Sequence, residues 1–269
     1  MPGHPSSSRF FSATPVFGRA EFAEAVGRRP GDRAITELLK YHLRAGNIRR
    51  ISRGVFASVR KGTHPAPTTV DRLLAASRLR PGAVIAYQSA LELHGCPMIQ
   101  GTEVQLIASG EPGCIDTVDF ACRFVRPTIP CSLSDGVTTF ERQGVSVNAT
   151  TLERTLVDLF HRYDLAGGAE GLFGSLDLMM ETEVSLNLDA LVGFASRLGN
   201  ATAIGVLGFW LDRERHALGV EAAEALEELR SLAPRHAAYA LGATPGHGRA
   251  ATGWNVILPA DIVERYFDD

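Results

Sequence analysis

The stretch from residue 14 to residue 59 constrains the fold most, because two helical patterns and a hairpin pattern follow one another within it. The first pattern predicts a helix over residues 19–26, which Gly27 ends. The second predicts a helix that begins after Asp32, its N-cap, and stops at Gly46. The apolar stripes are formed by Phe22, Ala23 and Val26 in the first helix and by Ile35, Leu38, Leu39 and Leu43 in the second.

A two-stranded hairpin is predicted directly after these helices. Residues 48–51 alternate apolar and charged side chains, residues 52–54 can turn, and residues 55–59 return as a second strand. Two helices joined by a turn and followed by a basic hairpin describe a winged helix-turn-helix, whose second helix enters the major groove of DNA. An ordinary pair of amphipathic helices with solvated arginines would show part of the same pattern.

The predicted DNA-binding side chains lie on the second helix, before it and on the hairpin. Arg33, Thr36 and Lys40 are predicted to read base edges. Arginines in the turn and the hairpin are predicted to hold phosphates. The complete predicted set is Arg19, Arg28, Arg33, Thr36, Lys40, Tyr41, Arg44, Arg49, Arg50 and Arg53.

The distribution of charge supports this placement. The net charge of the chain is only -3, but residues 1–80 hold 15 Lys and Arg against 5 Asp and Glu, a net charge of +10. Residues 81–269 hold 12 and 25, a net charge of -13. A basic module attracts a polyanion and an acidic one is repelled by it, so DNA is expected to meet the N-terminal end.

The 269-residue chain is long enough for two domains. We predict a DNA-binding domain over residues 1–62, a linker with a connecting helix over 63–80, and a second domain over 81–269. Residues 1–13 are expected to be a loose arm or a short leading helix. The breaker-rich stretch 61–67 marks the boundary, and Thr68 and Thr69 are predicted to cap the connecting helix, which ends at Arg78.

The C-terminal part is predicted to be mixed α/β, which makes the whole chain α+β. Period-two patterns between residues 103 and 147 predict a small sheet. Its strands are expected at 104–107, 115–120, 122–125 and 145–147, after a short helix over 87–95. Helices follow at 151–162, 169–180, 188–198, 202–213 and 221–232, and then a Gly-rich loop over 242–253 and a strand over 254–258.

No catalytic site is expected in this part. Ser89 and His94 lie five residues apart on one helix and point away from each other, so packing and capping are favoured over catalysis. Arg154 and Asp158 are predicted to form an exposed, weak ion pair. Carboxylates of Glu103, Asp116 and Asp119, near Gln105, could hold a metal ion in a nuclease, but residues 81–147 contain no lysine and a solvated sheet face is favoured.

The chain is expected to be cytoplasmic, without membrane spans, cofactors or metals. Its cysteines, Cys96, Cys114, Cys122 and Cys131, form no C-x-x-C pair and are predicted to be reduced thiols. Nothing before Phe10 resembles a secretory leader, and no apolar run approaches the roughly 18 residues that cross a bilayer.

Four motifs in their order and spacing resemble one family over nearly the full length of the chain. The resemblance is to AbiEi-type antitoxins of type IV abortive-infection toxin–antitoxin systems. The motifs are Leu43 to Phe56, Ser89 to Gly95, Thr151 to Asp158, and Leu207 to Leu211 with Trp254 to Ile257.

The resemblance implies an autorepressor that binds inverted repeats of double-stranded DNA in its own promoter. It also implies that the C-terminal domain counteracts a nucleotidyltransferase-like toxin, and it supplies no catalytic residues. Independently, the acidic side of the helix at 221–232, with Glu221, Glu224, Glu227 and Glu228, could meet a basic protein partner. A nuclease delivered to DNA and a transcription regulator that senses a small molecule are the alternatives.

Overall fold

A computed structural model describes residues 7–59, 70–96, 103–128, 133–182, 185–218 and 222–265. The chain divides into two compact units that alternate along the sequence. The first unit comprises Met1–Ile85, Thr102–Arg126 and Thr139–Ala149, and the second comprises Ala86–Gly101, Pro127–Thr138 and Thr150–Asp269. The predicted linker over 61–67 and the predicted caps Thr68 and Thr69 lie outside the described residues.

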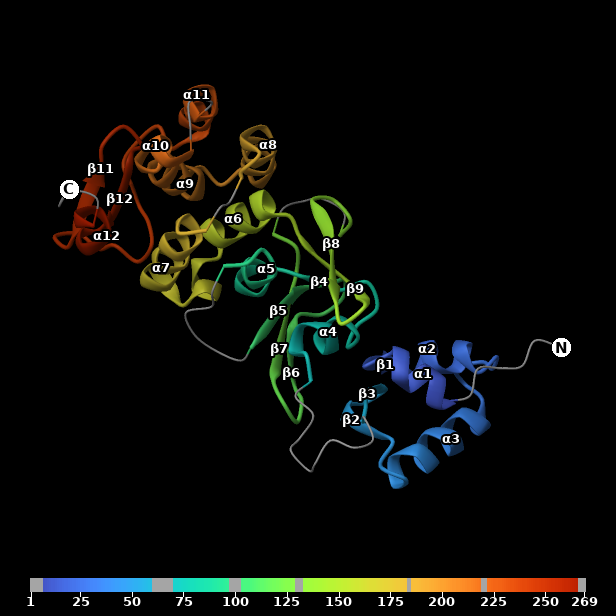
Figure 1. The fold of residues 1–269 in the computed structure, drawn as a ribbon. Helices are drawn as coiled ribbons and strands as arrows, with labels where there is room; N and C mark the ends of the chain where they lie inside the picture. Colours follow the sequence, from blue (N-terminus) through green and yellow to red (C-terminus); the bar gives the residue numbers. More distant parts are fainter. Residues whose placement is uncertain are drawn as a thin grey trace. The chain divides into compact units, whose positions relative to one another are not determined.

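The N-terminal part of the first unit contains three helices and a small antiparallel sheet (Figure 1). The helices are α1 (Ser7–Ala13), α2 (Arg19–Ala25) and α3 (Arg33–Arg44), and the strands, in sheet order, are β1 (Val16–Gly18), β3 (Val55–Ser58) and β2 (Ile48–Ser52). The two predicted helices and the hairpin are present, and α1 is the leading helix foreseen as one of two options. The sequence patterns missed β1, which has only three residues.

These elements share one core. Phe17, Phe22, Ile35, Ile48 and Phe56 are buried in a single cluster, so both helices and the sheet depend on each other. The helices end where glycines were predicted to end them. Gly27 and Gly46 both have positive φ, a conformation in which glycine pays no Cβ penalty, and the amides that follow them bond back to each helix.

The rest of the first unit is built on a six-stranded mixed sheet. Helix α4 (Arg72–Ser77) precedes it, and Asp71 caps this helix by accepting from the amides of Leu73 and Leu74. In sheet order the strands are β6 (Gly113–Asp116), β7 (Ala121–Val125), β5 (Val104–Ile107), β4 (Val84–Ile85), β9 (Val145–Thr150) and β8 (Val137–Arg142). The strand predicted over 115–120 instead ends at Asp116, because Thr117 turns the chain by accepting from the amide of Phe120.

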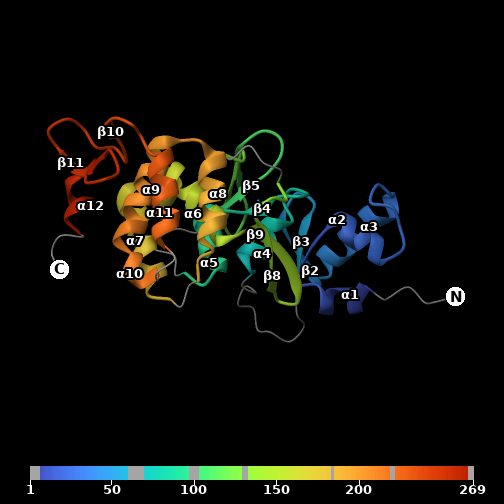
Figure 2. The ribbon, with the colours of Figure 1, turned by 90° about the horizontal axis from the view of Figure 1, so that it is seen from above.

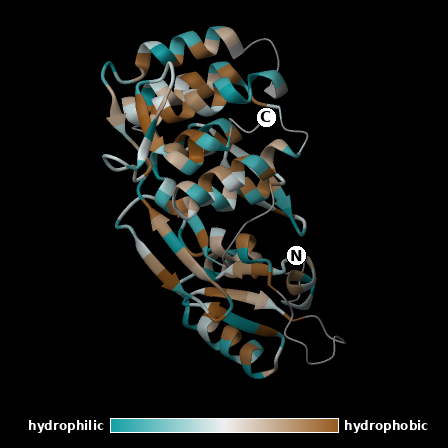
Figure 3. Ribbon diagram, turned by 90° about the vertical axis from the view of Figure 1, so that its left-hand side faces the viewer, coloured by the Kyte–Doolittle hydropathy of each residue, from teal (hydrophilic) through white to brown (hydrophobic). Residues whose placement is uncertain are grey.

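The second unit is mainly helical. Its helices are α5 (Tyr87–Leu93), α6 (Leu152–His161), the 3-10 turn η1 (Tyr163–Ala166), α7 (Gly168–Met180), α8 (Leu188–Leu198), α9 (Ala201–Arg213), α10 (Arg215–Leu218) and α11 (Ala222–Leu232). The predicted helices are confirmed to within one or two residues. Figure 2 shows α6, α8, α9 and α11 gathered in one bundle, and Figure 3 shows hydrophilic and hydrophobic residues mixed along the helices, as amphipathic helices require.

A small sheet closes the second unit and packs on α9. Its strands, in sheet order, are β10 (Ala238–Tyr239), β12 (Val256–Pro259) and β11 (Gly248–Ala251), and α12 (Ala260–Glu264) follows. Strand β11 lies where a loop was predicted. The buried indole of Trp254 covers Gly208 of α9, where a Cβ would overlap the ring. Its Nε1 donates to Asp212 at 3.2 Å, and Arg230 lies over its face.

The prediction that Arg154 and Asp158 form an exposed pair is wrong. Their side chains are 0% and 1% exposed, and the two groups lie 3.6 Å apart inside the second unit. Arg154 also donates through Nη1 to the carbonyl of Asp135, while the carbonyl of Gly136 accepts from the amide of Thr151. Burial raises the pKa of Asp158 to about 6, against the opposing effect of Arg154. The pair therefore belongs to the core.

Three of the cysteines are free thiols, as predicted: Cys96, Cys114 and Cys122. Burial raises the pKa of the Cys122 thiol to about 12, so it stays protonated at neutral pH. Cys131 lies outside the described residues. None of the helices in the described part of the chain combines the length and the apolar character that crossing a bilayer requires.

Candidate nucleic-acid interface

Helix α3 has one buried side and one exposed side. Ile35, Leu39 and His42 are buried. Arg33, Lys40, Tyr41 and Arg44 are exposed, and Tyr41 keeps 62% of its surface accessible although it is aromatic. An exposed aromatic side chain among cations is suited to contact with bases rather than with a protein core.

His42 helps to hold α3 in place. Its Nδ1 lies 3.1 Å from Nδ2 of Asn47, the residue that follows the helix stop at Gly46. Its ring packs edge-on against Phe11 of α1, with ring centroids 4.8 Å apart. Burial lowers the pKa of His42, which favours the neutral imidazole. The apolar stripe predicted for α3 therefore also contains a histidine, which the sequence patterns did not reveal.

Arg19 and Thr36, two of the predicted DNA contacts, are engaged with each other. Arg19 donates through Nη2 to Oγ1 of Thr36 at 2.8 Å and through Nε to the carbonyl of Pro30 at 2.6 Å. The same Nη2 lies 3.3 Å from the carbonyl of Asp32. Arg19 thus ties the start of α2 to the turn before α3 and to the first turns of α3. Its role in this structure is to position α3.

The turn between α2 and α3 exposes two arginines. Arg28 was predicted as a phosphate contact and is exposed, with its backbone amide bonded to the carbonyl of Ala23 at 2.8 Å. Arg29, which the predicted set omitted, is exposed beside it, and its amide lies 3.3 Å from Oδ2 of Asp32. The signal for Arg29 was present in the sequence as part of the Arg-Arg-Pro-Gly turn.

On the hairpin, Arg50 and Arg53 are exposed, whereas Arg49 is bound within the first unit. Arg50 lies over the ring of Phe56, with its Cζ 5.8 Å from the centroid. Arg49 forms an ion pair of 2.7 Å with Asp119, which lies in the turn between β6 and β7, and only 25% of its side chain is accessible. Neighbouring residues of a strand point to opposite faces, which explains why Arg50 is exposed and Arg49 is not.

Seven exposed side chains therefore remain from the predicted set. Lys40 among them lies 3.0 Å from Glu37, an exposed pair that phosphates can compete with. The seven are Arg28, Arg33, Lys40, Tyr41, Arg44, Arg50 and Arg53. We call these residues, together with Arg29, the basic surface. Its members come from α3, the turn before it and the hairpin after it.

Two of the three carboxylates considered for a nuclease, Glu103 and Asp119, are bound by arginines. Glu103 accepts from Nε of Arg123 at 2.9 Å, and Asp119 is held by Arg49. Within the described ranges, no three His, Cys, Asp or Glu side chains come together as metal ligands would. Ser89 is buried, and Nε2 of His94 lies 2.8 Å from the carbonyl of Thr150, which fits the predicted packing roles.

Comparison with solved structures finds a similar fold. No family model and no curated protein sequence matches the chain. Among solved structures, the chain is similar to the crystal structure of the RV2827C protein from Mycobacterium tuberculosis. The similarity has a TM-score of 0.61 at 16% sequence identity and covers 99% of this chain and 96% of that one. At this identity it shows that the two proteins share an α+β fold over nearly their whole length.

Proposed function

We propose that residues 7–59 form a winged helix-turn-helix that binds double-stranded DNA. In this proposal α3 enters the major groove and the β2–β3 hairpin lies against the phosphate backbone. The observation that carries it is the basic surface. Cations lie on the exposed side of α3, in the turn before it and on the hairpin after it, while the other side of α3 is buried.

The side chains divide into two proposed roles. Arg33, Lys40 and Arg44 lie along α3 and can donate to guanine edges, while Tyr41 can pack on thymine methyl groups. Arg28, Arg50 and Arg53 flank the helix and are suited to phosphates, whose contacts carry no sequence information. Thr36 and Arg49 are weaker candidates for DNA contacts, because Thr36 already binds Arg19 and Arg49 already binds Asp119.

We further propose that the protein is the autorepressor and antitoxin of a type IV toxin–antitoxin system. This rests on the resemblance to AbiEi-type antitoxins, which implies inverted repeats in its own promoter as the operator and a nucleotidyltransferase-like toxin as the antagonist. The acidic side of α11 fits a basic partner, because Glu224, Glu227 and Glu228 are exposed there while Leu226 and Leu229 are buried. Glu221 lies outside the described residues.

The DNA-binding proposal is tested by titrating the full chain against its own promoter fragment at several salt concentrations. Each phosphate contact contributes about 0.9 to the slope of log affinity against log salt. Replacing Arg50 and Arg53 by Ala should lower the slope by about 1.8 if each holds one phosphate. Arg215→Ala with Arg235→Ala removes the same charge from exposed positions of the second unit and should leave the slope unchanged. Equal slopes for all three proteins would refute the proposed interface.

The antitoxin proposal is tested by growth rescue in cells that express the product of the neighbouring gene. Replacing Glu224, Glu227 and Glu228 by Gln should weaken rescue if α11 meets a basic surface of that product. The matched control carries Glu141→Gln, Glu181→Gln and Asp189→Asn, which remove equal charge from other exposed positions. Failure of the wild-type chain to rescue growth would refute the antitoxin role and leave DNA binding intact.

A further inference from the structure

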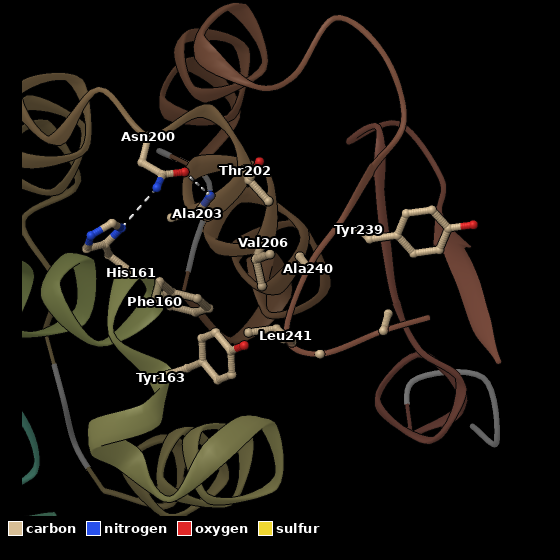
Figure 4. Close-up of a pocket in the computed structure, with 12 residues that line it drawn as sticks. Phe160, His161, Tyr163, Asn200, Thr202, Ala203, Val206, Tyr239, Ala240 and Leu241 are labelled. Atoms are coloured by element: carbon tan, nitrogen blue, oxygen red, sulfur yellow. Dashed lines mark hydrogen bonds between the residues drawn. The ribbon is translucent and has the colours of Figure 1, made fainter. Parts of the chain in front are cut away.

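The second unit contains a half-open pocket of about 310 Å³. It lies between the end of α6, the turn η1, the first turns of α9, and strand β10 with the turn that follows it (Figure 4). Pockets that bind small molecules begin at about this size. All of the lining segments belong to one compact unit, so the pocket is a feature of that unit alone.

The side chains that remain accessible in this pocket are mostly polar. Phe160, Val206 and Leu241 contribute to the wall, but each is almost wholly buried. Apart from the methyl group of Ala243, the accessible side chains are those of His161, Tyr163, Asn200, Thr202 and Tyr239. Each of these five carries a group that donates or accepts a hydrogen bond. Sites for apolar ligands have a mainly hydrophobic lining, so this lining indicates a polar ligand instead.

The pocket lining is also uncharged. None of the described side chains that line it is Arg, Lys, Asp or Glu. The amide of Asn200 is oriented because its Oδ1 accepts from the backbone amide of Ala203 at 3.1 Å, which leaves Nδ2 to donate to Nδ1 of His161 at 3.0 Å. This bond favours the neutral imidazole, and burial also lowers the pKa of His161. A charged ligand would lose its hydration here without gaining a counter-charge.

Three polar groups of the lining have no partner among the described residues. Because Nδ1 of His161 accepts the bond from Asn200, Nε2 carries the proton, and no described residue accepts from it. The hydroxyls of Tyr163 and Thr202 likewise form no hydrogen bond with another described residue. A hydroxyl both donates and accepts, so these groups together can bind two or more hydroxyls of one ligand. They come from α6, η1 and α9, so only the folded unit brings them together.

We propose that this pocket binds an uncharged polyhydroxylated ligand, a sugar. The sugar hydroxyls bond to Nε2 of His161 and to the hydroxyls of Tyr163 and Thr202. Tyr239 keeps 49% of its surface accessible and stands across the pocket from His161, so its ring can pack against the C–H groups of the sugar (Figure 4). This site is independent of the basic surface and goes beyond the proposed DNA binding.

The test uses glucose, galactose and ribose as neutral probes, and glucuronate and glucosamine as charged probes of similar size. Saturation-transfer NMR with the full chain should detect binding of at least one neutral sugar and give much weaker transfer to both charged sugars. Tyr163→Phe and Thr202→Val should each weaken binding of the neutral sugar about fivefold, the effect of one neutral hydrogen bond. Tyr41→Phe and Thr139→Val remove hydroxyls from exposed positions of the first unit and should have no effect.

Thr202→Glu provides a second test, which adds a charge to the pocket. Thr202 is partly exposed in the first turn of α9, where an acidic side chain interacts favourably with the helix dipole, so the helix is retained. The new carboxylate should weaken binding of the neutral sugar and favour glucosamine, because it can pair with the ammonium group. Thr139→Glu adds the same charge to the first unit and should leave the preference unchanged.

Three outcomes would each overturn the proposal. They are no binding of any of the three neutral sugars, equal or tighter binding of a charged sugar by the wild type, and an unchanged preference in the Thr202→Glu variant. The melting temperature of each variant shows whether its fold is kept. DNA affinity measured on the same samples keeps the outcome separate from the proposed function.

Discussion

Arg19 binds Thr36 across the turn between α2 and α3, with its Nη2 donating to Oγ1 at 2.8 Å. The arginine sits at the first residue of α2, and the threonine lies in the second turn of α3. Together with the bonds from Arg19 to the carbonyls of Pro30 and Asp32, this contact fixes the angle at which α3 leaves the turn. Arg19 thereby influences the proposed interface without belonging to its exposed side.

Replacing Arg19 by Ala should weaken binding to the promoter fragment at least about tenfold, because several hydrogen bonds from one charged group are lost. The slope of affinity against salt should stay the same, since no phosphate contact is removed. Arg19→Lys should behave like the alanine variant, because an ammonium cannot reproduce the fork that reaches Pro30 and Thr36. A slope that falls by about 0.9 would show instead that Arg19 contacts phosphate directly.

Breaking the ion pair between Arg49 and Asp119 should strengthen DNA binding, whereas loss of Arg19 should weaken it. Replacing Asp119 by Ala frees the guanidinium of Arg49 and removes a negative charge beside the hairpin, so DNA binding should become tighter. The salt slope should rise by about 0.9 if Arg49 then meets a phosphate. Asp116→Ala removes the same charge from an exposed position that carries no such pair with Arg49, and should increase affinity less. Weaker binding by the Asp119 variant would show that the pair positions the hairpin instead.

Trp254 and Gly208 give a stability prediction with an internal control. Gly208→Ala places a Cβ into the indole of Trp254, and such overpacking typically costs about 1–3 kcal/mol. Gly193 lies in α8, is exposed and has open space around it, so Gly193→Ala should instead stabilise the chain by about 0.5–1 kcal/mol. Chemical denaturation of the two variants measures both changes. Equal effects of the two substitutions would contradict the packing seen here.

The buried pair of Arg154 and Asp158 is suited to a double-mutant cycle. Asp158→Leu leaves the guanidinium without its counter-charge and should cost about 3–5 kcal/mol of unfolding free energy. Arg154→Met combined with Asp158→Leu replaces both groups by apolar side chains and should cost less than Asp158→Leu alone. Additive losses in the cycle would mean that the two side chains act separately.

The sequence predicts those elements whose periodicity or end signals are local. Helices α6 to α9 were placed to within one or two residues, because their apolar repeats are local, and the structure shows Thr151, Asn187 and Asn200 capping α6, α8 and α9. Strands β8 and β11 were missed, since exposed residues such as Thr139 and Arg249 interrupt their apolar pattern. Their strand conformation comes from pairing with neighbours, which no local pattern reveals.

The sequence predicted which positive charges belong to the candidate interface, but not which of their side chains are exposed. Composition and spacing located the cations of α3 and the hairpin, and most of them are exposed. Some of these cations bind partners that are distant in the sequence and are therefore not free to contact DNA. Arg19 binds Thr36 and Arg49 binds Asp119. In the same way, the spacing of Arg154 and Asp158 fits a surface pair as well as a buried one, and only the packing around α6 decides.

The alternation of the two compact units along the chain has a practical consequence. Residues 102–126 and 139–149 return to the unit that begins with α1 to α3, while residues 86–101 and 127–138 belong to the other unit. A cut near residue 62 therefore separates Arg49 of β2 from its ion-pair partner Asp119, and a cut near residue 81 separates α4 from β4 and β5, which it contacts. Truncated fragments would lose native partners at either cut, so the activities of both ends have to be compared through point substitutions in the intact polypeptide.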